Sequence, residues 1–355
     1  LWIILVNVAG LNLYRALYSH TAHRRANAGA AWLLIVMAPV CLSWHLYRNL
    51  ENGTDTLPFA LVQPNLDPYT EKFIPAKQAQ HLDRFFDTAD HLCDENTRIL
   101  IGPETQIVEQ IDERAPWTSP PYRRLRAFQR QFPNLSILLG GHSFARLNPG
   151  ATVPGSRYNA EKDIYYEAFN SALFLPREQE AGFYHKSKLV PLFERMPFVQ
   201  HLGFLGRFSL ALGGYQGTYS NRQAQTVFMD HEKKMSILPI VCFESAFGAY
   251  CAQRLPQQRG FIAMITNDGW WKNTPGYKHH FNFSRMRAIE SRRELIRAAN
   301  NGISAHIDAR GRVKAQTAWW QAATLKGTVH LRAGRTFFSR HGDFLGRAAL
   351  FCAVG

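Results

Sequence analysis

Short apolar runs alternate with helically spaced apolar positions over most of the chain. Runs bounded by turn residues predict strands over 57–63, 98–102 and 135–141, and apolar spacing predicts helices over 76–92 and 122–131. The same patterns predict further strands over 166–175, 181–189, 226–230, 235–243, 261–267 and 303–309, and further helices over 245–254 and 277–299. Strands that alternate with helices and also follow one another indicate an α/β sandwich of layered sheets and helices.

Both ends of the chain are apolar. Residues 1–14 (LWIILVNVAGLNLY) carry no charge, and the chain closes on the hydrophobic run AALFCAVG. A second run over 30–44 falls short of the roughly 20 residues of a membrane span, but its flanks would extend it. We expect one or two transmembrane helices here and the start of another at the end. A signal peptide is the alternative for the first run, although its basic residues follow the apolar stretch, and a buried core helix is the alternative for the second.

Arg15, Arg24 and Arg25 lie between the two N-terminal runs. Because short basic loops stay on the cytoplasmic side, this loop predicts that everything after Trp44 lies on the outer side of the membrane.

Composition narrows the possible functions. The formal charge is +14, which favours contact with an anionic membrane surface or a nucleic acid. No zinc-finger spacing or basic tail is present and the arginines are spread along the chain, so we expect no nucleic-acid partner. The five cysteines include no CxxC pair, which argues against a disulfide framework and a structural zinc site. The adjacent His279 and His280 point about 100° apart on a helix and are poorly placed to bind one metal ion.

Cys242 stands where an apolar strand (ILPIV) runs into a helix-like stretch. Such a turn projects a nucleophile toward substrate, and a helix N-terminus would lower the pKa of the thiol. A buried, inert cysteine is the alternative interpretation.

Two further places carry candidate chemistry. Glu104 follows the strand RILIG, at the carboxyl end where α/β sheets usually bind ligands, although it could equally be a solvated loop residue. Lys186, Lys188 and Glu194 lie in YHKSKLVPLFERMP, where the lysines could instead protect a sheet edge.

Taken together, these motifs resemble the nitrilase superfamily of carbon-nitrogen hydrolases, and within it most closely the apolipoprotein N-acyltransferases. The resemblance runs from about residue 57 to 343 and rests on GPET, on YHKSKLVPLFE, on CFE at 242–244, and on ITNDGWW followed by RAANNGISAHIDARG. It implies a nitrilase-like αββα sandwich. It also implies transmembrane helices with a basic loop over 1–50, a catalytic domain over 57–340 and a further transmembrane helix starting over 343–355.

The resemblance also implies residue roles. The family's Glu–Lys–Cys triad falls on Glu104, Lys186 and Cys242, with Glu194, Glu244, Phe243 and Tyr184 in supporting positions. Cys242 would take an acyl chain from a phospholipid as a thioester, Glu104 would move protons, and Lys186 would stabilise the oxyanion. The acceptor would be the α-amino group of the diacylglyceryl-cysteine of an apolipoprotein, at the bacterial inner membrane with the catalytic domain on the periplasmic side. No metal or other cofactor is implied, and membrane attachment favours a monomer.

Three positions depart from the family pattern. Phe193 stands where a glycine is usual, Phe243 replaces a tyrosine, and Phe73 replaces an early tryptophan. These changes bear on the lipid pocket more than on the triad. A carbon-nitrogen hydrolase acting on a small substrate uses the same triad and remains the main alternative, and an inactive membrane scaffold is a second.

Overall fold

The computed structural model describes residues 2–148, 151, 153, 156–191, 193–194, 219–221 and 227–354. The chain divides into two compact units, one formed by Leu1–Asn52 with His341–Gly355 and the other by Gly53–Arg340.

The first unit is helical. It contains α1 (Trp2–Leu17), α2 (Ala22–Arg48) and α9 (Phe344–Val354), while the short α8 (Phe337–His341) ends where this unit resumes. The α2 helix is long and apolar enough to cross a membrane, and none of its residues is buried, which speaks against the core-helix interpretation. The basic loop is shorter than expected, because Arg15 lies in α1 and Arg24 and Arg25 lie in α2. The good helix formers of this segment continue both helices toward the turn.

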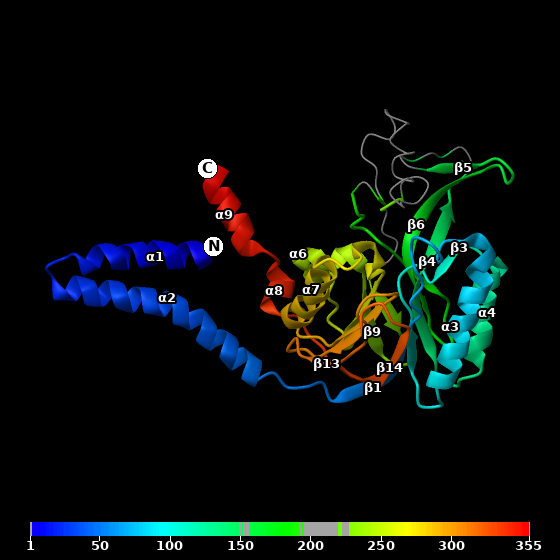
Figure 1. Cartoon of the computed structure of the whole chain (residues 1–355), viewed down its shortest axis with the longest axis horizontal. Helices are drawn as coiled ribbons and strands as arrows, with labels where there is room; N and C mark the ends of the chain where they lie inside the picture. The colour runs from blue at the N-terminus through cyan, green and yellow to red at the C-terminus, as the bar shows by residue number, and fades with distance from the viewer. Residues whose placement is uncertain are drawn as a thin grey trace. The chain divides into compact units, whose positions relative to one another are not determined.

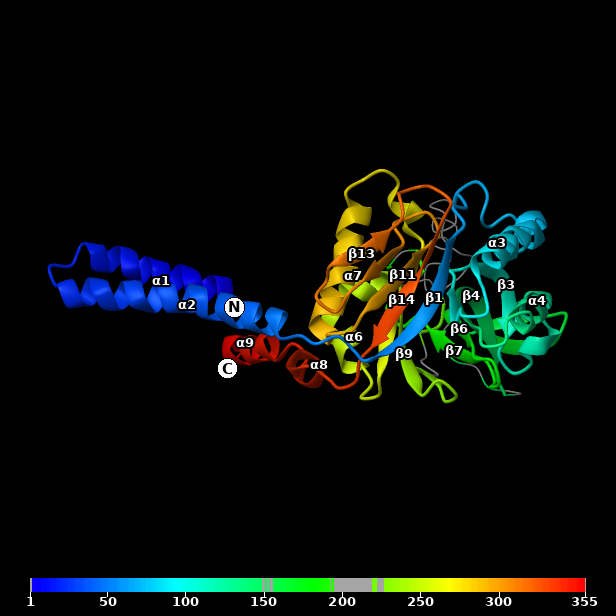
Figure 2. The same cartoon turned by 90° about the horizontal axis from the view of Figure 1, so that it is seen from below.

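The second unit contains two sheets (Figures 1 and 2). The first has the order β14-β1-β2-β4-β6-β5, with β3 also paired to β4 and β7 to β6, and the second has the order β13-β12-β11-β10-β9-β8. The strands of the first sheet are β1 (Asp55–Gln63), β2 (Ile99–Ile101), β3 (Ile107–Asp112), β4 (Ser136–Arg146), β5 (Arg157–Asn159), β6 (Ile164–Leu175), β7 (Gly182–His185) and β14 (Ala323–Leu331). Those of the second are β8 (Phe228–Asp230), β9 (Met235–Val241), β10 (Gly260–Thr266), β11 (Leu295–Ala299), β12 (Ala305–Ile307) and β13 (Val313–Gln316).

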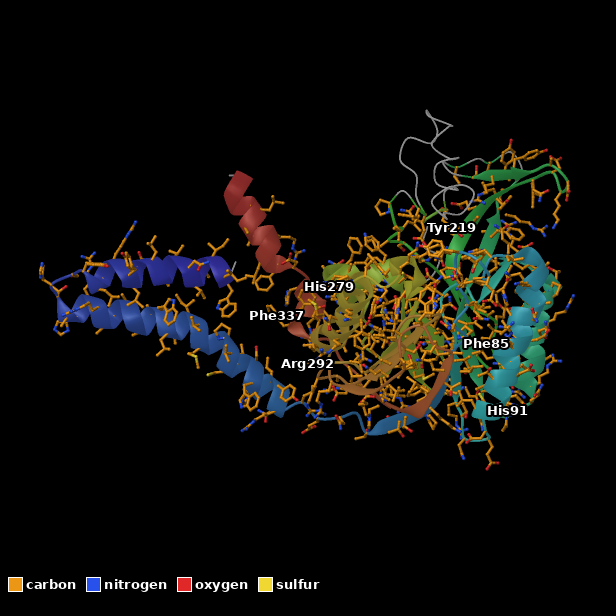
Figure 3. The ribbon with its side chains drawn as sticks, viewed as in Figure 1. Phe85, His91, Tyr219, His279, Arg292 and Phe337 are labelled. Carbon is orange, nitrogen blue, oxygen red and sulfur yellow. The ribbon has the colours of Figure 1, made fainter. Side chains whose placement is uncertain are left out.

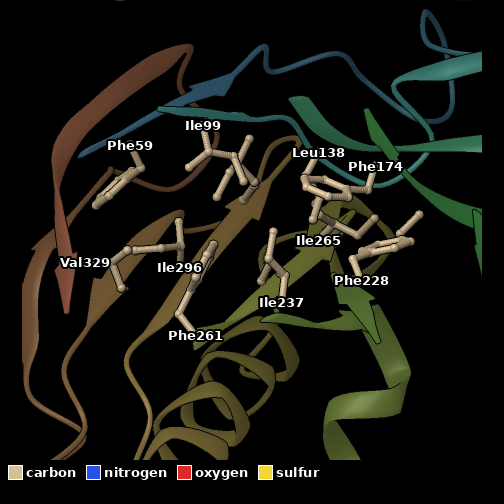
Figure 4. Close-up of a cluster of buried hydrophobic side chains, with 14 of the residues drawn as sticks. Phe59, Ile99, Leu138, Phe174, Phe228, Ile237, Phe261, Ile265, Ile296 and Val329 are labelled. Atoms are coloured by element: carbon tan, nitrogen blue, oxygen red, sulfur yellow. The ribbon is translucent and has the colours of Figure 1, made fainter. Parts of the chain in front are cut away.

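The sheets face one another across an apolar core. Phe59, Ile99 and Leu138 of the first sheet meet Ile237 and other side chains of the second (Figure 4). Because successive side chains of a strand point to opposite faces, the intervening residues pack outward against helices. This arrangement explains why β2, β9 and β10 are largely apolar instead of alternating with polar residues.

Helices cover both outer faces. The helices α3 (Gln78–Leu92) and α4 (Pro120–Arg130) pack on the first sheet, and α6 (Gly248–Gln253) and α7 (Gly276–Ser291) pack on the second (Figures 1 and 2). Phe85 of α3, labelled in Figure 3, is fully buried in the outer core of the first sheet. The αββα sandwich predicted from the sequence is therefore confirmed.

Three element predictions were wrong in extent or type. The helix predicted over 277–299 ends at Ser291, because Arg292 turns into the left-handed conformation at φ 53°, and Leu295–Ala299 forms β11 parallel to β10. The helix predicted over 245–254 is divided into the single 3-10 turn η3 (Cys242–Ala246) and α6. The strand predicted over 181–189 ends at His185, where the chain leaves the sheet.

Candidate active site

Cys242 lies where β9 ends. The strand runs through Val241, and Cys242 begins the 3-10 turn η3 with a positive φ of 48°, an uncommon conformation for a residue other than glycine. The parallel neighbour β10 places Ile265 opposite Val241, so this end of the central strands lies beside the nucleophile candidate. The sharp turn predicted from ILPIVCFES is therefore present.

Glu104 and Lys186 come from the other sheet and meet beside this turn. Glu104 follows β2 and Lys186 follows β7 directly, and both side chains are buried. The Lys186 Nζ lies 3.0 Å from Glu104 Oε1 and 2.8 Å from Glu194 Oε1. A backbone bond from the Gly140 N–H to the Pro103 carbonyl (2.9 Å) holds the chain just before Glu104 against β4.

The charges of this cluster reinforce one another. Burial alone would raise the pKa of Glu104, but Lys186 and a hydrogen bond from Asn170 outweigh it and lower the pKa. Burial alone would lower the pKa of Lys186, but Glu104 and Glu194 raise it well above its ordinary value. Glu104 is therefore an ionised carboxylate and Lys186 a cation at neutral pH.

The thiol of Cys242 behaves differently from the expectation. Burial and then the charge of Glu104 raise its pKa to about 12, against smaller opposing effects of Lys186 and a hydrogen bond with Thr266. The expected lowering by a helix N-terminus was wrong, since the element that follows is a single five-residue 3-10 turn and not a long helix. Cys242 is therefore a thiol at neutral pH.

Glu244 and Tyr184 tie the two sheets together around the site. Glu244 is fully buried and accepts hydrogen bonds from the Tyr184 hydroxyl (2.6 Å), the Ser187 N–H (2.8 Å) and the Val241 N–H (2.9 Å). One carboxylate thus connects the segment after Lys186 to the turn that carries Cys242. Phe243 points elsewhere in this arrangement and packs edge-to-face against the ring of Phe247, 5.2 Å away.

Glu194 and Asn170 complete the charged cluster. Glu194 also accepts from the Val190 N–H (2.8 Å), which closes the loop that follows Lys186. Asn170 of β6 donates to Glu104 Oε1 (2.8 Å) and to Glu194 Oε1 (2.9 Å), so its amide holds the two carboxylates around one lysine. Asn170 was not predicted, since an asparagine in the middle of a strand carries no motif of its own.

Lys72 is the second residue that sequence reasoning missed. It lies in the turn after β1, its side chain is 1% exposed, and its Nζ donates to the backbone carbonyl of Glu104 (2.8 Å). Its local sequence, YTEKFIP, looks like a solvated turn and gave no signal of burial.

A buried cluster of His280, Asp268 and Arg297 contacts the backbone of Cys242. The His280 Nε2–H donates to the Cys242 carbonyl (3.0 Å), the His280 Nδ1 lies 2.8 Å from Asp268 Oδ1, and Arg297 Nη2 lies 2.8 Å from Asp268 Oδ2. Burial would raise the pKa of Asp268, but Arg297 and His280 lower it strongly. Within the described part of the chain no group of His, Cys, Asp and Glu side chains is arranged to hold a metal ion.

Two of the departures from the family pattern lie at the edge of this region. The ring of Phe73 stacks with His142 (6.5 Å between centroids) and with Trp270 (6.1 Å). Phe193 is exposed.

Comparison with known proteins identifies the family of this chain. The family model described as carbon-nitrogen hydrolase matches residues 142–336, which include Lys186 and Cys242. An apolipoprotein N-acyltransferase of Chlorobaculum tepidum is 28% identical over 98% of this chain and 65% of its own length. One of Geobacter metallireducens is 26% identical over 99% of this chain and 63% of its own length. The chain therefore spans less than two thirds of the length of these relatives.

Solved structures share the fold. A CN-hydrolase superfamily protein of Xanthomonas campestris has a TM-score of 0.51 and 16% identity, covering 78% of this chain and 91% of that one. A C145A mutant of an amidase from Nesterenkonia has a TM-score of 0.52 and 13% identity, covering 84% of this chain and 98% of that one. With a family model that covers more than half of the sequence and a sandwich of the same fold, this chain belongs to the carbon-nitrogen hydrolase family.

Proposed function

We propose that this protein is an N-acyltransferase that moves a fatty acyl chain from a phospholipid to the α-amino group of a diacylglyceryl-cysteine at the N-terminus of an apolipoprotein. The observation that carries the proposal is the cluster at the end of β9, where the Cys242 thiol faces the charges of an ionised Glu104 and a cationic Lys186. A nucleophile, a base and a fixed cation are the groups that acyl transfer through a covalent intermediate requires.

In the first half-reaction Glu104 accepts the thiol proton as the Cys242 sulfur attacks the ester carbonyl of the lipid. The new oxyanion develops beside Lys186, and a single well-placed donor of this kind contributes about 3–4 kcal/mol to transition-state stabilisation. The ester C–O bond then breaks, and Glu104 returns the proton to the departing lysophospholipid alcohol. A thioester on Cys242 remains.

In the second half-reaction the acceptor amine attacks this thioester. The amide forms as the C–S bond breaks, and the sulfur of Cys242 regains a proton through Glu104. Glu194, Asn170, Glu244 and Tyr184 act as positioning residues, since each holds a charged group or a turn of the site in place.

The transferase is favoured over a hydrolase of small amides because the named relatives match nearly the whole chain, including the N-terminal helices. The apolar α2 helix fits an enzyme that acts on a phospholipid and on a lipid-modified protein. We further propose that the catalytic unit lies on the periplasmic side of the inner membrane, in line with Arg15 at the end of α1 and Arg24 and Arg25 at the start of α2, and that the protein acts as a monomer.

The first test is to incubate the protein in detergent with phosphatidylethanolamine and to look for acyl mass on the peptide that carries Cys242. A diacylated lipopeptide is then added, and wild type is compared with Cys242→Ala. We expect an acyl adduct that discharges onto the lipopeptide amine and is absent in the variant.

A different result would favour the hydrolase. If no adduct forms from the lipid while small amides are hydrolysed in a Cys242-dependent way, the protein is an amidase or nitrilase. If neither reaction occurs although the protein is folded, acyl-transfer chemistry at Cys242 is wrong.

A further inference from the structure

Lys72 is a second buried lysine beside the reacting groups, and the mechanism above does not use it. Its backbone is fixed from both sides, since the Lys72 N–H donates to the Asp67 carbonyl (2.8 Å) and the Lys72 carbonyl accepts from Gln78 Nε2 (2.6 Å). The side chain is itself buried, and its Nζ donates to the Glu104 carbonyl, so the ammonium group lies inside the site and away from solvent.

The two lysines of the site have opposite surroundings. Lys186 Nζ contacts two carboxylates, at 3.0 and 2.8 Å, whereas Lys72 Nζ donates to a backbone carbonyl and lies 5.9 Å from the centroid of the Phe73 ring. A buried ammonium that faces two carboxylates stays charged, while one that faces a neutral carbonyl loses much of the compensation for its lost hydration. The geometry thus makes Lys186 a permanent cation and Lys72 a group that can release its proton.

The charged groups around Lys72 do not reverse this difference. Burial lowers its pKa to about 7, against opposing effects of Glu104 and Cys242. His142, which also senses the charge of Lys72, has its own pKa lowered to about 4, chiefly by burial, and is neutral at pH 7. A neutral Lys72 can still donate an N–H to the Glu104 carbonyl, and its nitrogen lone pair is then available to accept a proton.

In the second half-reaction one proton of the acceptor amine has no assigned base. An α-ammonium group must lose two protons to become an amide nitrogen, and Glu104 handles only the proton that returns to the sulfur. Attack by water or by an amine that is already neutral would not need this extra acceptor. A transferase that uses a protonated amine requires a group that a hydrolase does not.

We propose that Lys72 is the base that deprotonates the incoming α-ammonium group, which makes it a catalytic residue specific to aminolysis of the thioester. This inference rests on the proposed function.

The substrate ammonium gives a proton to the Lys72 Nζ, and the freed nitrogen lone pair forms the C–N bond at the thioester carbonyl. The carbonyl π pair becomes an oxyanion beside Lys186. When the oxyanion collapses, the C–S bond breaks, Glu104 moves the second N–H proton to the sulfur, and Lys72 later releases its proton to water.

The test separates the half-reactions. Wild type, Lys72→Met and Lys72→Arg are loaded in detergent from phosphatidylethanolamine, and formation of the Cys242 adduct is timed by mass spectrometry. A diacylated lipopeptide is then added at pH 7. We expect discharge of the loaded adduct onto the lipopeptide to be slowed by about 100-fold in both variants, the lower range for loss of a general base, and by far more than loading is slowed in the same variant.

Hydroxylamine is the matched nucleophile, because it is mostly unprotonated at neutral pH and needs no base. It should discharge all three adducts at similar rates, which shows that the thioester and Lys186 remain competent. The variant defect should also shrink as the pH rises above about 8, where the lipopeptide amine deprotonates by itself. In wild type the discharge rate should fall as the pH drops below about 7 and Lys72 becomes protonated.

Each remaining result overturns the inference. If both variants discharge onto the lipopeptide at the wild-type rate, or if hydroxylamine and lipopeptide are slowed equally, Lys72 is not the base. If Lys72→Met fails to load, Lys72→Arg and the wild-type pH profile decide, and a flat profile between pH 6 and 8 contradicts the inference. Failure of wild type to load or transfer would instead count against the proposed function.

Discussion

At the scale of single residues, the negative charge of the Glu104 carboxylate disfavours ionisation of the Cys242 thiol. The carboxylate that we propose as the proton acceptor during attack is also, after burial, the main reason that the thiol holds its proton at rest. Such a pair suppresses unwanted reactions of a thiolate until a substrate carbonyl is in place.

We predict that Glu104→Gln changes two reactions of Cys242 in opposite directions, with faster alkylation and slower acylation. Because a negative charge beside Cys242 is removed, its pKa falls, and alkylation of Cys242 by iodoacetamide between pH 7 and 9 becomes faster than in wild type. Acylation by phospholipid falls by about 100-fold or more, because the base is lost. Peptide mass spectrometry follows Cys242 separately from the other cysteines.

In wild type the same alkylation should increase steadily up to pH 9 without a plateau, since a thiol with a pKa of about 12 is far from half-ionised there. A plateau near neutral pH would show a stable thiolate and would contradict the resting state described above.

Glu244 offers a second prediction at this scale. Glu244→Gln replaces a carboxylate that accepts from Tyr184, Ser187 and Val241, and leaves at least one buried donor without a partner, at a cost of about 1–3 kcal/mol in the free energy of unfolding. Tyr184→Phe removes one of these bonds and leaves the backbone bonds, so it should cost about 1 kcal/mol. Urea unfolding measures both, and equal losses would show that Glu244 does not organise the turn.

At the scale of elements, β4 fits against the turn that carries Glu104. A Cβ at Gly140 would lie 2.5 Å from the Glu104 Cα and the Thr105 N, which are backbone atoms and cannot move aside cheaply. Close packing of strand and turn is therefore part of how the base is positioned.

Gly140→Ala should displace Glu104. We expect a loss of about 1–3 kcal/mol in the free energy of unfolding, together with a large decrease in the acylation rate of Cys242. The control is Gly141→Ala, whose Cβ would meet the Ile107 Cβ at 3.2 Å and lies away from Glu104. Acylation that falls equally in both variants would mean that the effect is general and not due to Glu104.

Elements with a strong local signal were predictable, and elements stabilised by distant partners were not. The strand β9 is buried throughout and apolar apart from Ser236, and α3 shows helical spacing of Leu82, Phe85 and Phe86, so local pattern and tertiary position agree. In contrast, β11 contains Arg297, which is compensated by Asp268 from another part of the chain. The strand β14 has polar, partly exposed positions over most of its length and carries no continuous apolar signal.

The same distinction applies to the site. Glu104, Lys186 and Cys242 were suggested by motif resemblance together with their position at strand ends. Lys72 and Asn170 depend on segments far from them in sequence for their burial and partners, and His280 was considered only as a metal ligand. Contacts between polar residues far apart in sequence produce no periodic pattern, so a single sequence does not predict them.

At the scale of the whole molecule, the chain consists of two units, a layered sandwich and a helical unit that contains the apolar α2. The unit Gly53–Arg340 has its own layered core, and the other unit contains the apolar α2 with no buried residue. Membrane affinity should therefore depend mainly on residues outside the sandwich.

A fragment of residues 53–340 should unfold cooperatively in urea but lose stable membrane binding. We expect the full chain to co-sediment with phosphatidylethanolamine–phosphatidylglycerol vesicles at both low and high salt. The fragment should bind only at low salt, through its basic surface, because exposed charges are screened at high ionic strength. Equal, salt-resistant binding by both would place the membrane contact within the sandwich.

The positive φ of Cys242 has a consequence for selection. Glycine adopts this backbone conformation without steric cost, whereas any side chain is disfavoured there. Between two inactive variants, Cys242→Gly should therefore be more stable than Cys242→Ala. In a library of variants at position 242 that is screened for thermal resistance alone, glycine should therefore be enriched, although the proposed acyl transfer requires a thiol there. Under the proposed function, a cysteine is kept at this turn by a requirement for catalysis that opposes the requirement for stability.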